Sequence, residues 1–90
     1  MGITALKIRI MPESLDVNLE EIKKKAEEKI IKLGGKISSS NEENVAFGLK
    51  ALILTLVWPE EKDTGIVESE IAEIDGVSSA QIIDYRRAFG

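Results

Sequence analysis

The spacing of hydrophobic residues marks the first element of the chain. Over residues 3–11 apolar side chains occupy every second position, with Leu6, Ile8 and Ile10 on one side. This period of two predicts a half-buried strand. Pro12 ends the strand, because proline has no N–H for the sheet ladder.

Residues 18–33 carry their apolar side chains three or four positions apart, which predicts an amphipathic helix. Asn18 and Glu21 are placed to cap its first turn reciprocally. Gly34 supplies the left-handed residue that commonly stops a helix. A strand followed by a helix is therefore expected in the first third of the chain.

A long hairpin is predicted between Lys36 and Trp58. Its first arm, to about Asn44, is polar and rich in serine, which suits an edge strand. Its second arm, residues 49–58, is apolar at nearly every position, as expected of a central strand covered on both faces. Pro59 closes this arm.

The last third of the chain again contains a helix and a strand. The second helix is expected over about residues 65–74, with Thr64 as its N-cap and Gly76 as its stop. The final strand runs from Val77 to about Tyr85. The predicted order of elements is therefore β-α-β-β-α-β.

This order, in a chain of 90 residues, predicts a single α+β domain of the ferredoxin-like type, residues 1–90. Right-handed crossovers place both helices on one face of a four-stranded antiparallel sheet in the strand order 4-1-3-2. The opposite face is then an open contact surface, or it is shielded by long side chains such as Lys7 and Arg9. The central-strand residues expected on that face are Ala51, Ile53, Thr55 and Val57.

Composition narrows the possible chemistry. The chain contains no Cys and no His, so it lacks thiolate nucleophiles, disulfides, the commonest general base and the commonest metal ligand. Adjacent acidic residues such as Glu60 and Glu61 point in different directions into water, unlike a catalytic carboxylate pair. We therefore expect no catalytic residue, no metal and no cofactor, and a protein of the reducing cytoplasm.

The net charge of -4 results from 12 basic and 16 acidic residues. A nucleic-acid binder usually presents a dense basic face, whereas lysines here are interspersed with glutamates along residues 20–29, as on a solvated helix face. No apolar run approaches the roughly 18 residues of a membrane span. Direct contact with nucleic acid or membrane is therefore not expected, and a protein partner is.

The hairpin connection, Val45 to Lys50, is unusual because it contains one of only two phenylalanines. Gly48 beside Phe47 permits a bent backbone that lifts the ring outward. An exposed aromatic at a loop tip is a typical binding anchor. The alternative is that Phe47 packs back onto the end of the core.

The C-terminal segment, residues 84–90, contains the adjacent arginines Arg86 and Arg87. Neighbours in a strand point to opposite faces, so at most one of the two meets a given partner surface. The paired donors of arginine suit carboxylates and phosphates. The alternative is a frayed basic tail with no special role.

Several of these segments occur together in a known family. They are Ile10 to Ser14, Val45 to Leu52, Asp75 to Ser78 and Asp84 to Arg87, in this order and at this spacing. With them, the sequence resembles elongation factor 1-beta in its short archaeal form, over nearly the whole chain.

The resemblance implies a guanine-nucleotide exchange factor that promotes exchange of GDP for GTP on elongation factor 1-alpha, the GTPase that carries aminoacyl-tRNA. It implies that Phe47 enters a pocket on the GTPase, with Gly48 and Lys50 beside it. In eukaryotic relatives a lysine near the C-terminus disturbs the magnesium and phosphate site. This chain has no lysine after Lys62, so Arg86 or Arg87 is the candidate cation.

Nucleotide exchange needs no acid, base or nucleophile of its own. A partner that binds the empty GTPase more tightly than the loaded one weakens nucleotide binding by the same factor. The absence of His and Cys is compatible with this function. The alternative function is a ligand-sensing or oligomerisation module of the same fold, acting through its open sheet face.

Overall fold

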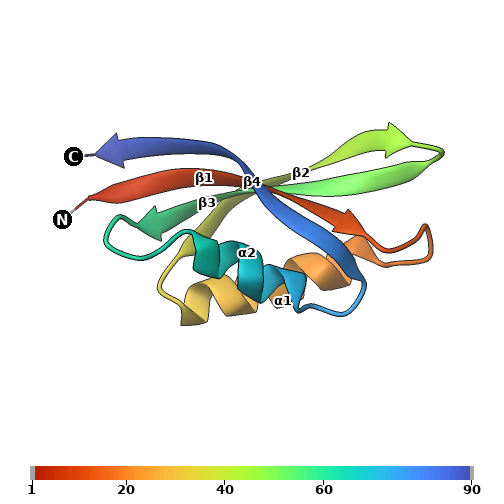
Figure 1. The fold of residues 1–90 in the computed structure, drawn as a ribbon, viewed down its shortest axis with the longest axis horizontal. Coiled ribbons are helices and arrows are strands. Elements are labelled where there is room, and N and C mark those ends of the chain that lie inside the picture. The colour runs from red at the N-terminus through yellow and green to blue at the C-terminus, as the bar shows by residue number, and fades with distance from the viewer. Residues whose placement is uncertain (1, 90) are drawn as a thin grey trace.

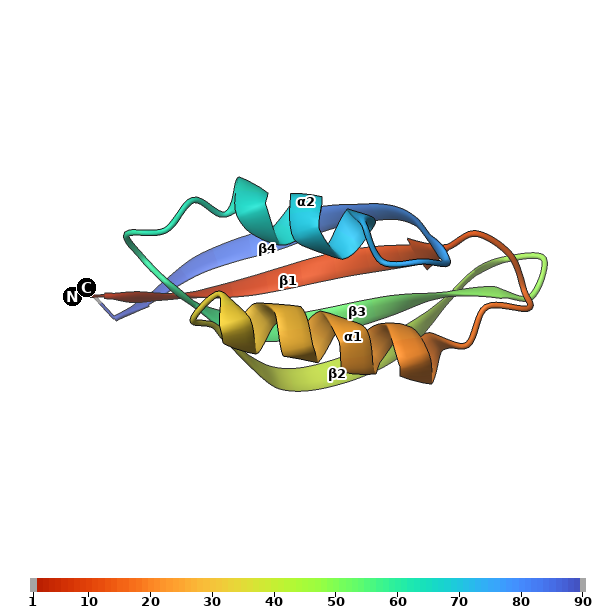
Figure 2. The same cartoon turned by 90° about the horizontal axis from the view of Figure 1, so that it is seen from below.

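The computed structural model describes residues 2–89, and its elements follow the predicted order. They are β1 (Ile3–Pro12), α1 (Leu19–Lys32), β2 (Lys36–Ala46), β3 (Leu49–Pro59), α2 (Gly65–Ala72) and β4 (Val77–Phe89). The strands form one antiparallel sheet in the order β2-β3-β1-β4, and both helices cover the same face of it (Figure 1 and Figure 2). Read from the other edge, this is the order 4-1-3-2, so the predicted α+β ferredoxin-like fold is confirmed.

The hydrophobic core lies between the sheet and the two helices. Alternate residues of β1 and β3 point toward the helices and pack against the apolar sides of α1 and α2. Within this core, the residues with no exposed area are Leu6, Ile8, Ile10, Ala26, Ile30, Leu54, Leu56, Trp58, Val67 and Ile71. The period of two in the strands and the helical spacing in α1 therefore predicted the faces that meet in the core.

The starts of the two helices differ from the predicted caps. The Asn18 Oδ1 accepts a hydrogen bond from the backbone N–H of Glu20 at 2.9 Å, one residue earlier than a capping box requires. Thr64 makes no side-chain cap bond, and the Asp63 Oδ1 accepts from the N–H of Gly65 at 2.9 Å instead. Thr64 occupies the predicted N-cap position, but its side chain does not cap the helix because its backbone is already helical, with φ -69° and ψ -23°, whereas a capping side chain works from an extended backbone.

Charged side chains cover part of the sheet face that carries no helix. Ala51 and Ile53 are only 0% and 8% exposed, although they point away from the helices. The Arg9 Nε of β1 lies 3.7 Å from the Glu43 Oε1 of β2, and because β3 lies between these strands the ion pair passes over β3. Of the two expectations for this face, shielding by long side chains is the one confirmed at Ala51 and Ile53.

The sheet extends beyond the helices and gives the molecule two distinct ends. The principal extents are 42 × 21 × 18 Å, and Figure 1 shows the β2–β3 connection at one end of the long axis and both chain termini at the other. β4 continues to Phe89, four residues beyond the predicted end, and pairs with β1 as far as Ile3. This pairing adds length to the end that carries the termini.

Gly35 joins α1 to β2 at a position with no room for a side chain. A Cβ there would lie 2.8 Å from the Trp58 Cε3 and 2.9 Å from the Ile30 Cγ2. We expect Gly35→Ala to lower the free energy of unfolding by about 1–3 kcal/mol through overpacking, as measured by urea denaturation. Gly65→Ala is the matched control, because the nearest atom to its Cβ would be the Asp63 Oδ1 at 3.3 Å. Equal stabilities of the two variants would contradict this description of the core.

Candidate partner-binding site at the two ends of the sheet

Phe47 and Gly48 form the two-residue turn that closes the β2–β3 hairpin. Both have positive φ, 53° for Phe47 and 80° for Gly48, as a type I′ turn requires. Asn and Gly usually fill such turns, because a bulky L-residue is sterically disfavoured there. Phe47 is the one non-glycine residue with positive φ among residues 2–89. Backbone strain of this kind clusters at functional positions.

The Phe47 side chain is 99% exposed. The alternative that the ring packs back onto the core is therefore wrong, and the expected outward orientation is confirmed. The ring contributes no burial to the fold, so neither backbone preference nor core packing accounts for a phenylalanine at this position.

Leu15 and Val45 extend the apolar surface around the turn. Leu15, in the β1–α1 loop, is 67% exposed, and Val45, near the end of β2, is 47% exposed. The Leu15 Cδ2 lies 3.8 Å from the point that a Cβ of Gly48 would occupy, so the loop packs against the turn. We call Leu15, Val45 and Phe47 the apolar end of the sheet.

Sequence reasoning missed Leu15, because a single leucine in a loop belongs to no periodic pattern. The available signal was its position directly after the segment Ile10 to Ser14, one of the segments that carried the family resemblance. That signal pointed to the loop without distinguishing an exposed leucine from a buried one. Only the packing of the loop against the hairpin shows that Leu15 joins the apolar end.

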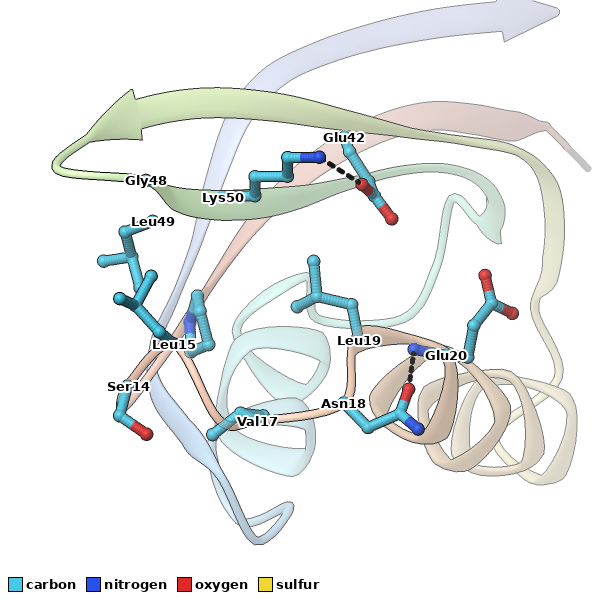
Figure 3. A pocket seen from close by; sticks show the side chains of 11 residues that line it. Ser14, Leu15, Val17, Asn18, Leu19, Glu20, Glu42, Gly48, Leu49 and Lys50 are labelled. Carbon is cyan, nitrogen blue, oxygen red and sulfur yellow. Dashed lines mark hydrogen bonds and ion pairs between the residues drawn. The ribbon is translucent and has the colours of Figure 1, made fainter.

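Gly48 and Lys50 also line a cavity that opens beside the turn, between the hairpin and α1 (Figure 3). The Lys50 Nζ lies 3.7 Å from the Glu42 Oε1 on the neighbouring strand, and the Lys50 side chain remains 53% exposed. The structure thus brings three of the predicted site residues, Phe47, Gly48 and Lys50, together at one end of the sheet.

Arg86 and Arg87 lie in β4 at the other end. The register pairs both with residues of β1, so the alternative of a frayed tail is wrong for these two residues. The Arg86 Nε lies 3.3 Å from the Asp84 Oδ2, and the Arg87 Nη2 lies 3.3 Å from the Glu60 Oε1. The two side chains remain 79% and 61% exposed, which leaves guanidinium surface available to a partner.

The two groups of predicted site residues do not form one cluster. Arg86 pairs with Ala5 of β1, and Ala5 pairs on its other side with Val57 of β3. The hairpin turn lies at the opposite end of β3, which begins at Leu49. Eight residue steps separate Leu49 from Val57 (57 − 49), or about 26 Å at about 3.3 Å per residue. A small ligand cannot touch both ends at once, whereas a macromolecule can.

The described surface offers groups for contact with proteins. Between residues 2 and 89 no three acidic, His or Cys side chains gather closely enough to hold a metal ion. No helix in the same range has the length and apolar character of a membrane span. The exposed aromatic ring and the exposed arginines are residue types that are enriched in protein–protein interfaces.

Comparison with known proteins identifies the family. Residues 5–87 match the family model of the EF-1 guanine nucleotide exchange domain. The chain belongs to this family. The match covers both ends of the sheet, and membership gives this EF-1 exchange domain a role in guanine nucleotide exchange in translation elongation.

Archaeal relatives named elongation factor 1-beta are similar to this exchange domain over nearly its whole length. The protein of Methanosarcina barkeri is 44% identical over 89 residues, which cover 97% of this chain and 99% of the relative. That of Methanothermobacter thermautotrophicus is 40% identical over 88 residues, 97% of this chain and 98% of the relative. That of Natronomonas pharaonis is 39% identical over 88 residues, 97% and 99% of the two chains. The resemblance inferred from the sequence is confirmed.

The strain at Phe47 makes a prediction about stability. We expect Phe47→Asn to raise the free energy of unfolding by about 1 kcal/mol, because asparagine tolerates positive φ and loses no packing here. Urea denaturation of the variant and of the unmodified exchange domain measures the difference. A loss of about 3–5 kcal/mol, as for truncation of a buried phenylalanine, would show instead that the ring is packed.

Proposed function

We propose that this exchange domain acts on elongation factor 1-alpha, the GTPase that carries aminoacyl-tRNA, and accelerates its release of GDP. The observation that carries the proposal is Phe47, an aromatic ring 99% exposed on a backbone with φ 53°. The turn fixes the backbone that carries the ring, so little backbone entropy is lost when the ring enters a pocket of the partner.

The mechanism is differential binding. The domain binds the nucleotide-free GTPase more tightly than the GDP-loaded one, and by reciprocity GDP binds less tightly to the complex. No covalent step occurs on the exchange domain, which therefore acts as an exchange factor and not as an enzyme with chemistry of its own. We place it in the cytoplasm with its GTPase, without direct contact to nucleic acid.

The two ends of the sheet have separate tasks in this proposal. Phe47 anchors the hairpin end, Gly48 permits close approach of the backbone, and Lys50 contacts the rim of the interface. At the other end Arg86 or Arg87 brings a cation toward the place where the GTPase holds phosphate and magnesium. Because the two ends lie about 26 Å apart along β3, only a partner of macromolecular size can contact both of them.

The alternative of association through the helix-free sheet face has less support. That function requires a contiguous exposed apolar surface. Ala51 and Ile53 are buried on that face, and the Arg9–Glu43 ion pair passes over β3 there. The most exposed large apolar side chains among residues 2–89, those of Phe47 and Leu15, lie instead at the hairpin turn.

Release of labelled GDP from elongation factor 1-alpha tests the function. We expect catalytic amounts of the unmodified domain to accelerate release, and Phe47→Ala to weaken its action by about 2 kcal/mol, or about 30-fold in half-saturating concentration. The matched control is Ile31→Ala, which removes an apolar side chain 59% exposed on α1 that belongs to neither group of predicted site residues. If Phe47→Ala and Ile31→Ala behave alike, Phe47 is not the anchor.

The distance between the ends predicts how variants combine. We expect the free-energy effects of Phe47→Ala and Arg86→Ala on exchange to add within about 0.5 kcal/mol, because sites more than about 10 Å apart without shared partners are independent. The same holds for Phe47→Ala with Arg87→Ala. A double-mutant cycle on GDP release measures the coupling, and a coupling well above 1 kcal/mol (about fivefold in rate) would argue against two separate contacts.

A further inference from the structure

The cavity beside the hairpin turn has a volume of about 310 Å³. Its wall comes from four segments: the loop after β1, the first turn of α1, β2 through Glu42, and the hairpin turn with the start of β3 (Figure 3). The apolar part of the lining is formed by Pro12, Leu15, Val17, Leu19 and Leu49. The cavity is smaller than most sites for whole ligands, but it has room for a side chain that enters from a neighbouring surface.

Two carboxylates lie on opposite sides of this cavity. Figure 3 shows Glu20 projecting from α1 toward the hairpin and Glu42 projecting from the hairpin toward α1. The Glu42 carboxylate is 3.7 Å from the Lys50 Nζ, longer than the roughly 2.7–2.9 Å of a charge-assisted hydrogen bond. The Glu20 carboxylate takes part in none of the ion pairs formed among residues 2–89. Both carboxylates therefore have capacity for another cation.

We infer that this cavity receives a lysine or arginine side chain of the GTPase, an inference that rests on the function proposed above. The aliphatic stem of such a side chain lies along Leu19 and Leu49, and its cationic head lies between Glu20 and Glu42. The lining carries two carboxylates and one ammonium group, a net charge of -1. A cation neutralises this charge, whereas an anion would add to it.

The position of the cavity determines which molecule supplies the side chain. Gly48 and Leu49, which follow Phe47 directly, form part of the cavity wall, and Leu15 belongs both to the wall and to the apolar end. A GTPase surface that takes up the Phe47 ring therefore covers the mouth of the cavity as well. The hairpin end inserts a ring into the partner and accepts a cationic side chain from it.

The net charge of the chain favours a partner that supplies a cationic side chain. Its net charge is -4, and complementary charge on a partner speeds association and fixes the register of an interface. Lys50 is 53% exposed, so its ammonium group can turn toward water when a second cation approaches Glu42. The interface at this end then depends on ionic strength as well as on apolar contact.

The double variant Glu20→Gln/Glu42→Gln tests the inference, because it removes both charges with little change in shape. The control Glu27→Gln/Glu28→Gln removes two exposed charges of α1 outside the cavity, and so corrects for the change in net charge. The half-saturating concentration for GDP release from elongation factor 1-alpha is measured at low and high salt. Urea denaturation of both variants verifies that each is folded.

We expect the cavity variant to raise the half-saturating concentration by at least about fivefold at low salt, and to depend less on salt than the unmodified domain. The control variant should stay within about twofold of the unmodified domain. If the cavity variant matches the control while Phe47→Ala is impaired, the cavity assignment is wrong and the proposed function stands. If the unmodified domain does not accelerate GDP release at all, the proposed function is wrong and the cavity assignment falls with it.

Discussion

The antiparallel pairing of β1 with β3 is the interaction on which the rest of the structure depends. Eight Cα pairs, from Ile3 with Pro59 to Ile10 with Leu52, place the two most apolar strands at the centre of the sheet. A slip of one residue would turn the core side chains to the opposite face. The pairing of β1 with β3 ends at Ile10 and Leu52. Between that point and the turn, β3 pairs within the sheet only with β2. One register therefore sets both the core and the projection of Phe47.

A fixed sheet suits a protein that acts by preference between two states of a partner. Binding groups on a preordered scaffold lose little backbone entropy when a complex forms, so in the proposed function more of their interaction energy is available to favour the empty GTPase. The turn fixes the backbone of Phe47, and strand pairing fixes the backbone of Arg86 and Arg87. No reactive side chain is needed, which agrees with a chain that contains neither His nor Cys.

The sequence predicted the order of elements and the core faces well, because periods of two and of three to four residues report burial directly. The adjacent Gly48 permitted an outward Phe47 but left inward packing open, and the strained φ appears only in the structure. The choice between an open and a shielded face at Ala51 and the exposure of Leu15 depend on tertiary packing, whereas the Asp63 bond at α2 is local and was missed because Thr64 is the cap that the sequence pattern predicts. The distance between the ends could not be read from the sequence either, because it follows from strand register.

The central claim is that one rigid domain contacts its GTPase through both ends of the sheet. NMR spectra of the isotope-labelled exchange domain, titrated with nucleotide-free elongation factor 1-alpha, test it most directly. The amide signals of residues 45–50 and 84–87 should both shift or broaden, while those on the outer surface of α2 and of the later turns of α1 stay unchanged. Changes confined to the helices, or to one end of the sheet alone, would contradict the claim.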